Sequence, residues 1–590
     1  MCGLSGEVRL DAEAADVEAV ARMTAVMEPR GPDGVGVWSS GRVALGHRRL
    51  KVIDLSDKAA QPMVDSGLGI TGVFSGCLYN YRELRKALHA EGYHFFSTSD
   101  TEVLLKAYHR WGRDCVLRFK GMFTFALVER DSGVVVLGRD RLGIKPLYLT
   151  RDSERLRFAS TLPALLAGGD VNTDLDLVAL HHYMTFHSVV PAPRTILAGV
   201  EKLPPATVRT IRTDGRFDDY LYWRPDFSRR IPMNPEEWSE VVREGLRAAV
   251  DRRMVADVPV GVLLSGGLDS SFIVALLAES GQTGLSTYSI GFTAAEGEES
   301  DEFAYSDLVA ERFGTDHHRI RVDDSRLLPA LNGAIEAMSE PMVSHDVVAF
   351  YLLSREVSRH LKVVQSGQGA DEVFGGYDWY SPLAGIPRAD ALPAYAHVFF
   401  DRPHGELSGI LNPPYLLGHD AGSDFVRSHF SVPGAETTVD AALRIDTTVM
   451  LVDDPVKRVD NMTMAWGLEA RTPFLDHELV ELAAACPPEL KLAQNGKGVL
   501  KDAARGIVPD EVIDRPKGDF AVPAIRHLSG AYLELVREAL LAPSAKARGL
   551  FQPDYIARVL EAPGLYRTNR GASQLWQAAL LELWLQCHGV

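Results

Sequence analysis

The sequence has few cysteines, a deficit of positive charge and no long apolar run. Its cysteines are scattered, odd in number and never spaced as a CxxC pair; they are Cys2, Cys77, Cys115, Cys486 and Cys587. This usage is typical of a reducing compartment, so we expect neither a disulfide framework nor a zinc site.

The charge and hydropathy exclude two further classes. A formal charge of −17 argues against a general nucleic-acid binder, because phosphate contacts need clustered Lys and Arg. No uncharged apolar stretch reaches membrane-spanning length, and the amino terminus lacks the basic and then apolar pattern of a signal peptide. At 590 residues, 46% of them hydrophobic, the chain can build at least two cores. We therefore predict a cytoplasmic protein of two or more domains that binds small molecules rather than nucleic acid or membranes.

A glycine-rich stretch near the middle of the chain carries the clearest chemical signal. The apolar run 258–264 predicts a short buried strand, and the apolar stretch 272–278 predicts a helix. Between them lies Ser265-Gly266-Gly267-Leu268-Asp269-Ser270. A glycine turn that leads into a helix N-terminus is typical of a phosphate site. The alternative is an ordinary turn capped by Asp and Ser, which suits a lone Gly-Gly better than this full string.

A second glycine loop follows another predicted strand, 361–365. It reads Ser366-Gly367-Gln368-Gly369-Ala370-Asp371-Glu372. Asp371 and Asp269 are the carboxylates that could hold Mg²⁺ between the protein and a pyrophosphate. The alternative is a capped helix start. Alternating strands and helices in this half predict a doubly wound sheet with ligands at the carboxyl ends of its strands.

The amino terminus offers a nucleophile. Methionine before a small residue is normally removable, and its removal would leave Cys2 with a free α-amine beside the thiol. That amine has a pKa near ~8, low enough to act as the base for its own side chain. The alternative is a cysteine that merely happens to be second. Many short strands bounded by Gly, Pro and Asp follow, and they predict a mainly antiparallel layered domain.

Together these motifs resemble a known two-domain family. The loop at 265–270 resembles the pyrophosphate loop of the N-type ATP pyrophosphatases, and the segments 30–34, 46–54, 74–81 and 138–148 resemble the class II glutaminases. Over nearly its whole length the chain resembles the glutamine-hydrolysing asparagine synthetase family. The resemblance implies an antiparallel N-terminal-nucleophile glutaminase domain at 2–205, a connection at 206–235, and a doubly wound α/β ATP-pyrophosphatase domain at 236–590. It also allows a homodimer, which the sequence itself does not show.

The resemblance implies roles for residues of both domains. Cys2 attacks the glutamine amide, Arg49 pairs with the glutamine carboxylate, Asp100 takes its ammonium, and Ser75 with Gly76 stabilises the oxyanion. ATP would be bound by Leu263, Ser265, Gly266, Gly267, Asp269, Ser270, Ile290, Ser366 and Gly367, with Mg²⁺ on Asp269 and Asp371. Lys497 and the basic motif 515–520 would face the phosphates. The segment 456–476 carries the family signature Leu-Glu-Ala-Arg-x-Pro-Phe-Leu-Asp, in which we expect Pro473 to end a helix.

Three residues depart from the family pattern. Ser75 stands where the family has an oxyanion-binding Asn, so we expect weakened glutamine hydrolysis. Cys77 replaces a carboxylate that helps hold the ammonium. Gln368 replaces a Glu considered important for handling the acceptor or ammonia, and it cannot take up a proton.

The acceptor stays open between two carboxylates. Cys77 and Gln368, with the segments 188–194 and 339–346, resemble the branch that amidates N-acetylglutaminylglutamine to an osmoprotectant dipeptide amide. Aspartate is the alternative. An ammonia-dependent or β-lactam-forming ligase with a structural glutaminase half is a further reading, supported by Ser75. A non-catalytic binding protein is the last reading, disfavoured by the intact Asp269, Asp371 and Lys497.

Overall fold

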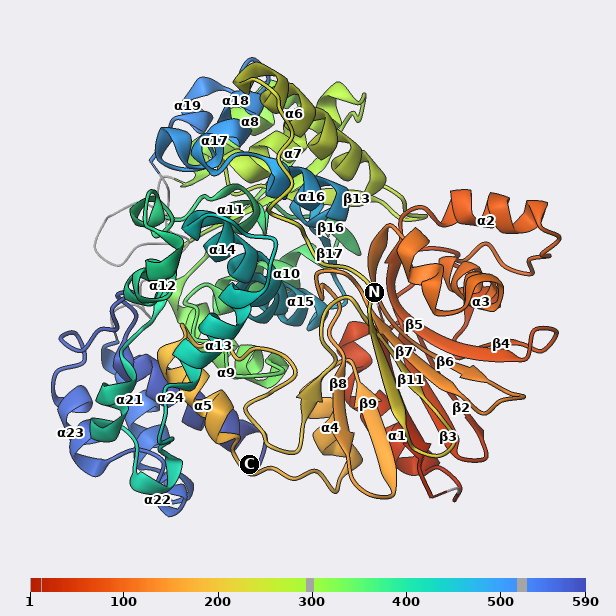
Figure 1. Cartoon of the computed structure of the whole chain (residues 1–590), viewed down its shortest axis with the longest axis horizontal. Helices are drawn as coiled ribbons and strands as arrows, with labels where there is room; N and C mark the ends of the chain where they lie inside the picture. The colour runs from red at the N-terminus through yellow and green to blue at the C-terminus, as the bar shows by residue number, and fades with distance from the viewer. Residues whose placement is uncertain (1, 12, 293–301, 517–527) are drawn as a thin grey trace.

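The chain folds into a β-rich amino-terminal half and a longer α/β carboxyl-terminal half that lie side by side (Figure 1). The computed structural model describes residues 2–11, 13–292, 302–516 and 528–590. The predicted fold class is confirmed, because two antiparallel sheets in the first half are followed by one parallel sheet in the second. In this described part, no helix combines the length and apolar character needed to cross a membrane.

Two six-stranded sheets stack in the amino-terminal half. Their strand orders are β10-β8-β9-β1-β3-β2 and β12-β11-β7-β6-β5-β4. The first sheet contains β1 (Gly3–Arg9), β2 (Gly34–Ser40), β3 (Val43–Arg49), β8 (Tyr148–Arg151), β9 (Arg155–Ala159) and β10 (Glu201–Lys202). The second contains β4 (Met63–Asp65), β5 (Ile70–Leu78), β6 (Gly121–Glu129), β7 (Val135–Arg139), β11 (Thr207–Ile211) and β12 (Phe217–Leu221).

Alternating apolar side chains of the two sheets form the core between them. Leu4 and Leu45 of the first sheet share one cluster with Val73 and Leu137 of the second. Helices α1 (Val17–Val26) and α4 (Leu162–Gly168) cover the outer face of the first sheet. Helix α3 (Asp100–Trp111) covers the second sheet, with α2 (Tyr81–Ala90) packed on it. The four layers place Cys2 at the start of β1, against the second sheet.

The connection between the halves contains fewer residues than the predicted 206–235. Strands β11 and β12 pair with each other, and β11 also pairs with β7, so residues 207–221 extend the second sheet. Helix α6 (Pro235–Arg252) then begins at a reciprocal cap between Asn234 and Glu237. The sequence pattern did not predict these strands, because Pro204 and Pro205 precede them and because β12 is a mostly exposed edge strand with no apolar run.

The carboxyl-terminal half is built on a five-stranded parallel sheet of order β15-β14-β13-β16-β17. Its strands are β13 (Val260–Leu263), β14 (Ser286–Phe292), β15 (Asp316–Val322), β16 (Val363–Gln365) and β17 (Glu469–Arg471). Side chains alternate between its faces. Val262 packs with Phe272 of α7 (Leu268–Glu279), whereas Leu263 packs with the cluster that contains α10 (Val347–Val357). Both faces are therefore buried by helices, as expected for a parallel sheet.

Further helices complete this half. They are α5 (Leu177–Thr185), α8 (Glu302–Phe313), α9 (Leu327–Ala337), α11 (Ala370–Phe374), α12 (Ala391–Phe399), α13 (Ala421–Ser431), α14 (Thr438–Ile445), α15 (Lys457–Met464), α16 (His477–Ala485), α17 (Pro488–Leu492), α18 (Gly498–Ala504) and α19 (Asp510–Ile513). The last four are α21 (Gly530–Leu541), α22 (Pro543–Arg548), α23 (Pro553–Glu561) and α24 (Gln574–Cys587). These four gather at the end of the molecule far from the second antiparallel sheet (Figure 1).

The helix that we expected to run to Pro473 ends earlier. Helix α15 stops at Met464, Gly467 turns the chain at a φ of 63°, and residues 469–471 form β17, which pairs in parallel with β16. A three-residue strand is too short to show a period of two, so the sequence pattern could not predict it.

Buried ion pairs join the two halves. Asp460 of α15 accepts from Lys145 Nζ at 2.7 Å and from Arg30 at 2.9 Å, and both cations belong to the amino-terminal half. A second group links Lys202 of β10 to Asp453 at 2.6 Å. Burial opposes the charged form of Asp460, but Arg30 and Lys145 lower its pKa to about 2. Each half thus supplies charges that the other half neutralises.

Replacing Asp460 by Asn should destabilise the protein strongly, because it leaves Arg30 and Lys145 buried without their anion. Removing one partner of such a buried pair costs about 3–5 kcal/mol. The contribution is present above pH ~4, where the unfolded aspartate is ionised, and is lost as the pH falls through about 2. Unfolding monitored in urea at several pH values measures both effects.

The matched control is Asp57→Asn, which removes an ion pair to Lys51 at a carboxylate that is 96% exposed. That change should alter stability by less than about 1 kcal/mol. Equal effects of the two substitutions would contradict the assigned role of Asp460.

Candidate active sites

A large cavity opens at the carboxyl ends of β13, β14 and β16. Its volume is about 880 Å³. Nearly all the residues for which the sequence implies a role in the second domain line it, namely Leu263, Ser265, Gly267, Asp269, Ser270, Ile290, Ser366, Gly367, Gln368, Asp371 and Lys497. Gly266 belongs to the same loop, and its carbonyl accepts a hydrogen bond from Arg515 at 3.1 Å.

The two glycine loops approach each other across this cavity. Gly266 has a φ of 70°, and a Cβ there would lie 2.6 Å from the backbone nitrogen of Ser306. A Cβ on Gly367 would lie 3.0 Å from the backbone nitrogen of Ser270. Helix α7 begins at Leu268, so its free N–H groups face the loop. Glycine at these two positions therefore lets the loops pack closely against neighbouring backbone, beside a helix N-terminus that is suited to an anion.

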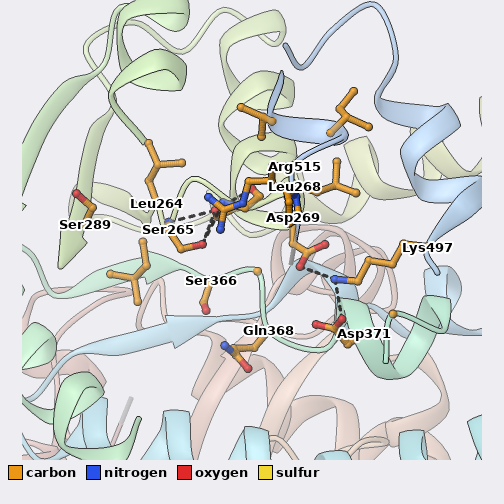
Figure 2. Close-up of a pocket in the computed structure, with 18 of the residues that line it drawn as sticks. Leu264, Ser265, Leu268, Asp269, Ser289, Ser366, Gln368, Asp371, Lys497 and Arg515 are labelled. Carbon is orange, nitrogen blue, oxygen red and sulfur yellow. Dashed lines mark hydrogen bonds and ion pairs between the residues drawn. The ribbon is translucent and has the colours of Figure 1, made fainter. Parts of the chain in front are cut away.

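A lysine lies between the two predicted metal ligands. Lys497 Nζ is 2.7 Å from Asp269 and 3.0 Å from Asp371 (Figure 2). Lys497 is buried at the start of α18 with a left-handed backbone, φ 56°. Burial alone would lower its pKa, but the two carboxylates outweigh burial and raise it. The three side chains therefore form one charged group.

Glu372, next to Asp371, is a buried carboxyl whose chemistry the motif alone did not reveal. Burial and the neighbouring Asp371 raise the pKa of Glu372 to about 7, while the Tyr377 hydroxyl donates to it at 2.6 Å. Gln368, in the loop before α11, lines the cavity and brings a neutral amide in place of a carboxyl (Figure 2).

A second, small cavity of about 30 Å³ lies beside Cys2, at the amino-terminal end of β1. It is lined by Cys2, Arg49, Gly76, Cys77 and Asp100, as the resemblance implied, together with Gln61, Ser99 and Thr101 among others. Burial raises the pKa of the Cys2 thiol. None of the described residues that line this cavity is a histidine, so no imidazole stands ready to deprotonate the thiol.

Arg49 and Asp100 both line this cavity. Two donors of Arg49 bind the carbonyls of Asp54 and Ser56, which leaves other guanidinium N–H groups for a ligand. Asp100 accepts from the backbone nitrogen of Leu78 at 3.1 Å, and burial raises its pKa to about 6. Asp100 is therefore ionised at neutral pH and can take an ammonium group.

Ser75 differs from the expected oxyanion donor. Its hydroxyl donates to the Cys2 carbonyl at 2.7 Å and accepts from the Cys2 backbone nitrogen at 3.3 Å. A serine hydroxyl has a single proton, so this arrangement commits it to the nucleophile's own backbone. The Gly76 N–H must then stabilise more of the charge on the oxyanion, which agrees with the expectation that the oxyanion is stabilised less well than in the family pattern.

Arg471 of β17 connects the two cavities, and its position could not be predicted without that strand. Its guanidinium lies 3.7 Å from the Cys77 sulfur and 2.6 Å from Glu469. Its backbone carbonyl accepts from Ser366, the residue that opens the second glycine loop, at 2.8 Å. The family signature contained this arginine, but only the fold places it against the glutaminase domain. Of the basic motif 515–520, residues 517–520 lie outside the described part of the chain.

Replacing Gly76 by Ala should disable the small cavity selectively. Gly76 has a φ of 150°, and a Cβ there would lie 2.1 Å from the Met122 carbonyl, so β5 and the Gly76 N–H must shift. We expect glutamine-driven turnover to fall about 10²-fold or more, the cost of an oxyanion donor, while turnover driven by ammonium salt persists. Steady-state rates with the two nitrogen sources measure this.

Gly41→Ala is the control, since Gly41 also has a positive φ but no atom lies within 4 Å of its added Cβ. Equal loss of both activities in the Gly76 variant would mean that the change acts on the whole fold.

Comparison with known proteins agrees with this two-site geometry. A family model described as asparagine synthase matches residues 241–586, and one described as a glutamine amidotransferase domain matches residues 1–223. The glutamine-hydrolyzing asparagine synthetase 1 of Bacillus subtilis is 31% identical and covers 99% of this chain and 96% of its own length. Synthetase 3 of that organism is 32% identical over 88% of this chain and 87% of its own. Amidase chry2 of Gibberella zeae is 29% identical over 84% of this chain and 83% of its own.

The asparagine synthase model spans more than half of the chain, and the first Bacillus relative aligns with almost all of it. The chain therefore belongs to the glutamine-hydrolysing asparagine synthetase family, carbon–nitrogen ligases that use glutamine as the amido donor.

Proposed function

We propose that this amidotransferase adenylates the carboxylate of N-acetylglutaminylglutamine with ATP and converts it to a carboxamide with ammonia from glutamine, releasing AMP and pyrophosphate. The observation that carries the two-site part is Arg471, which contacts Cys77 in one cavity and the loop of Ser366 in the other. The choice of acceptor rests on Cys77, Gln368 and the segments 188–194 and 339–346.

Aspartate is the second candidate acceptor. It is favoured by the two Bacillus relatives, whose names describe asparagine synthetases. Amidase chry2 has a different name at nearly the same identity, so likeness to the family alone does not select the acceptor.

In the small cavity, Cys2 is the proposed nucleophile. Once Met1 is removed, the α-amine of Cys2 can take the thiol proton, with a pKa near ~8. The thiolate attacks the glutamine amide carbon, the proton passes to the leaving nitrogen, and ammonia departs as a thioester forms. Water then hydrolyses the thioester to glutamate. Arg49 holds the substrate carboxylate and Asp100 its ammonium, so the amide carbon is directed at the sulfur.

In the large cavity, ATP would be bound by the two glycine loops and the N-terminus of α7. Asp269 and Asp371 fit Mg²⁺, because their oxygens are hard ligands and their shared contact with the Lys497 ammonium shows that they lie close enough together to bind one cation. When bound, the ion would neutralise charge on the departing pyrophosphate. Lys497 adds a positive charge beside the same oxygens. Gln368 can orient the acceptor or ammonia by hydrogen bonds but cannot accept a proton.

Ammonia must pass between the cavities without meeting water, because in water at neutral pH it is largely protonated and no longer nucleophilic. Arg471, Asp460 and Lys202 are all buried at the interface between the two halves. An internal passage through this interface belongs to the proposal.

Replacing Cys2 by Ala tests the glutaminase role. Glutamine-driven amide formation should fall below detection, because the only other thiol among the described residues that line the small cavity is the buried Cys77. Ammonium-driven formation should persist, since the large cavity is untouched. Amide product quantified by mass spectrometry with each nitrogen source measures this.

Cys77→Ala is the matched control. Burial raises the pKa of the Cys77 thiol, so it is not a thiolate at neutral pH, and glutamine-driven turnover should survive its loss. Unchanged glutamine use in the Cys2 variant would favour the ammonia-dependent ligase.

The acceptor is tested by product mass. The purified enzyme is given ATP, Mg²⁺ and glutamine with either N-acetylglutaminylglutamine or aspartate. We expect the dipeptide amide together with AMP and pyrophosphate. Asparagine as the sole product would replace the proposed acceptor by aspartate, and absence of ATP–pyrophosphate exchange with either would favour a non-catalytic protein.

A further inference from the structure

A third cavity of about 320 Å³, the chamber, lies beside the large cavity, which is the proposed ATP cleft. Asp346 belongs to the walls of both. Four segments that are distant in the sequence line it: 187–188, 341–346, 453–454 and 570–572. Two of these overlap the segments 188–194 and 339–346, whose sequences resemble the branch that amidates N-acetylglutaminylglutamine. The structure brings both segments to one place, next to the site where a carboxylate would be adenylated.

The partition that the chamber shares with the cleft is held in place by hydrogen bonds. Asp346 accepts from the Ser344 hydroxyl at 2.5 Å and pairs with Arg458 at 3.2 Å. Arg458 also donates to Ser344 at 2.6 Å and reaches Asp454 at 3.3 Å. One buried arginine thus fixes residues from two of the four segments, so the chamber is preformed.

The backbone of segment 187–188, which also lines the chamber, is strained. His187 and Ser188 are consecutive non-glycine residues with left-handed backbones, φ 50° and 57°. Ser188 donates to the Tyr183 carbonyl at 3.2 Å and accepts from Gln577 of α24 at 3.0 Å, which holds the turn. Such conformations persist where the surrounding structure imposes them, and they occur preferentially at ligand sites.

The chamber presents polar groups whose charges are largely paired. Lys202 holds Asp453 at 2.6 Å, and Arg458 holds Asp454. Arg570 donates to the Val398 carbonyl at 3.1 Å and pairs with Asp378 at 3.2 Å, a weak pair because Asp378 is 84% exposed, so its remaining N–H groups can serve a ligand. Among the described residues, each carboxylate of the lining already contacts a lysine or an arginine, so the lining suits neutral carbonyl and carboxamide groups, with Arg570 as a donor to a carbonyl oxygen.

We propose that this chamber binds the N-acylated, uncharged end of an extended acceptor whose terminal carboxylate lies in the ATP cleft. The inference rests on the proposed function and names the part of the protein that would recognise a blocked dipeptide. Each extended residue adds about 3.5 Å, so an N-acylated dipeptide extends farther from its carboxylate than a single amino acid such as aspartate does. Because Asp346 lies in the walls of both spaces, the longer acceptor can extend from the cleft into the chamber.

Two substitutions test the chamber by different means. Ala572→Phe fills it, and Arg570→Ala removes its carbonyl donor. Each should raise the KM for N-acetylglutaminylglutamine about tenfold or more, the effect of losing one hydrogen bond to a charged group. The kcat, the KM for ATP and the KM for the shorter acceptor N-acetylglutamine should stay unchanged. Acceptor-dependent ATP–pyrophosphate exchange measures all four values.

Matched controls separate recognition from folding. Ala557→Phe makes the same change on an exposed position of α23, and Asp378→Asn breaks the ion pair but keeps Arg570. Both should behave as wild type. If Ala572→Phe does not fold, as judged by lost glutamine hydrolysis, Arg570→Ala still decides the outcome.

The failures are distinguishable. If the wild-type enzyme uses the dipeptide and both chamber variants keep its KM, the chamber proposal is wrong and the proposed function stands. If the wild-type enzyme exchanges pyrophosphate with aspartate and not with the dipeptide, the proposed acceptor is wrong, and the chamber proposal falls with it.

Discussion

The buried guanidinium of Arg471 is the contact on which the rest of the structure depends. It is fully buried, and its donors meet Glu469 at 2.6 Å and the carbonyls of Arg253 and Val255 at 2.7 and 2.8 Å. A buried cation is costly unless its donors are satisfied, so these partners must keep their positions for the fold to persist. Because the same residue touches Cys77 and supports the loop of Ser366, the geometry of each cavity constrains the other.

Charged side chains of both signs line each cavity. In the large cavity, Asp269 and Asp371 both contact the Lys497 ammonium, so two carboxylates lie close enough together to bind one cation. In the small cavity, Arg49 and Asp100 both belong to the lining, and a zwitterionic amino acid supplies the complementary charges. Ion pairs between the two halves, such as Asp460 with Lys145, hold the two cavities at a fixed position relative to each other.

Particular elements show how far the sequence could be interpreted. The strand–loop–helix around Ser265 was predicted, because an apolar run, a glycine turn and a second apolar run each have a local signal. Strands β11, β12 and β17 were missed. The first two follow prolines and lie toward a sheet edge, and β17 is only three residues long, so pairing partners rather than periodicity define them.

The sequence by itself determined the two-domain family, the chemistry-bearing loops and the departures at Ser75, Cys77 and Gln368, because each is a property of residue type and local spacing. Tertiary structure alone decided that Ser75 is bonded to the Cys2 backbone, that Lys497 lies between Asp269 and Asp371, and that Arg471 reaches Cys77. It also decided that residues 187–188, 341–346, 453–454 and 570–572 enclose one chamber. The physical reason is that these contacts join segments far apart in the chain, whose distances are set by sheet order and helix packing rather than by local preference.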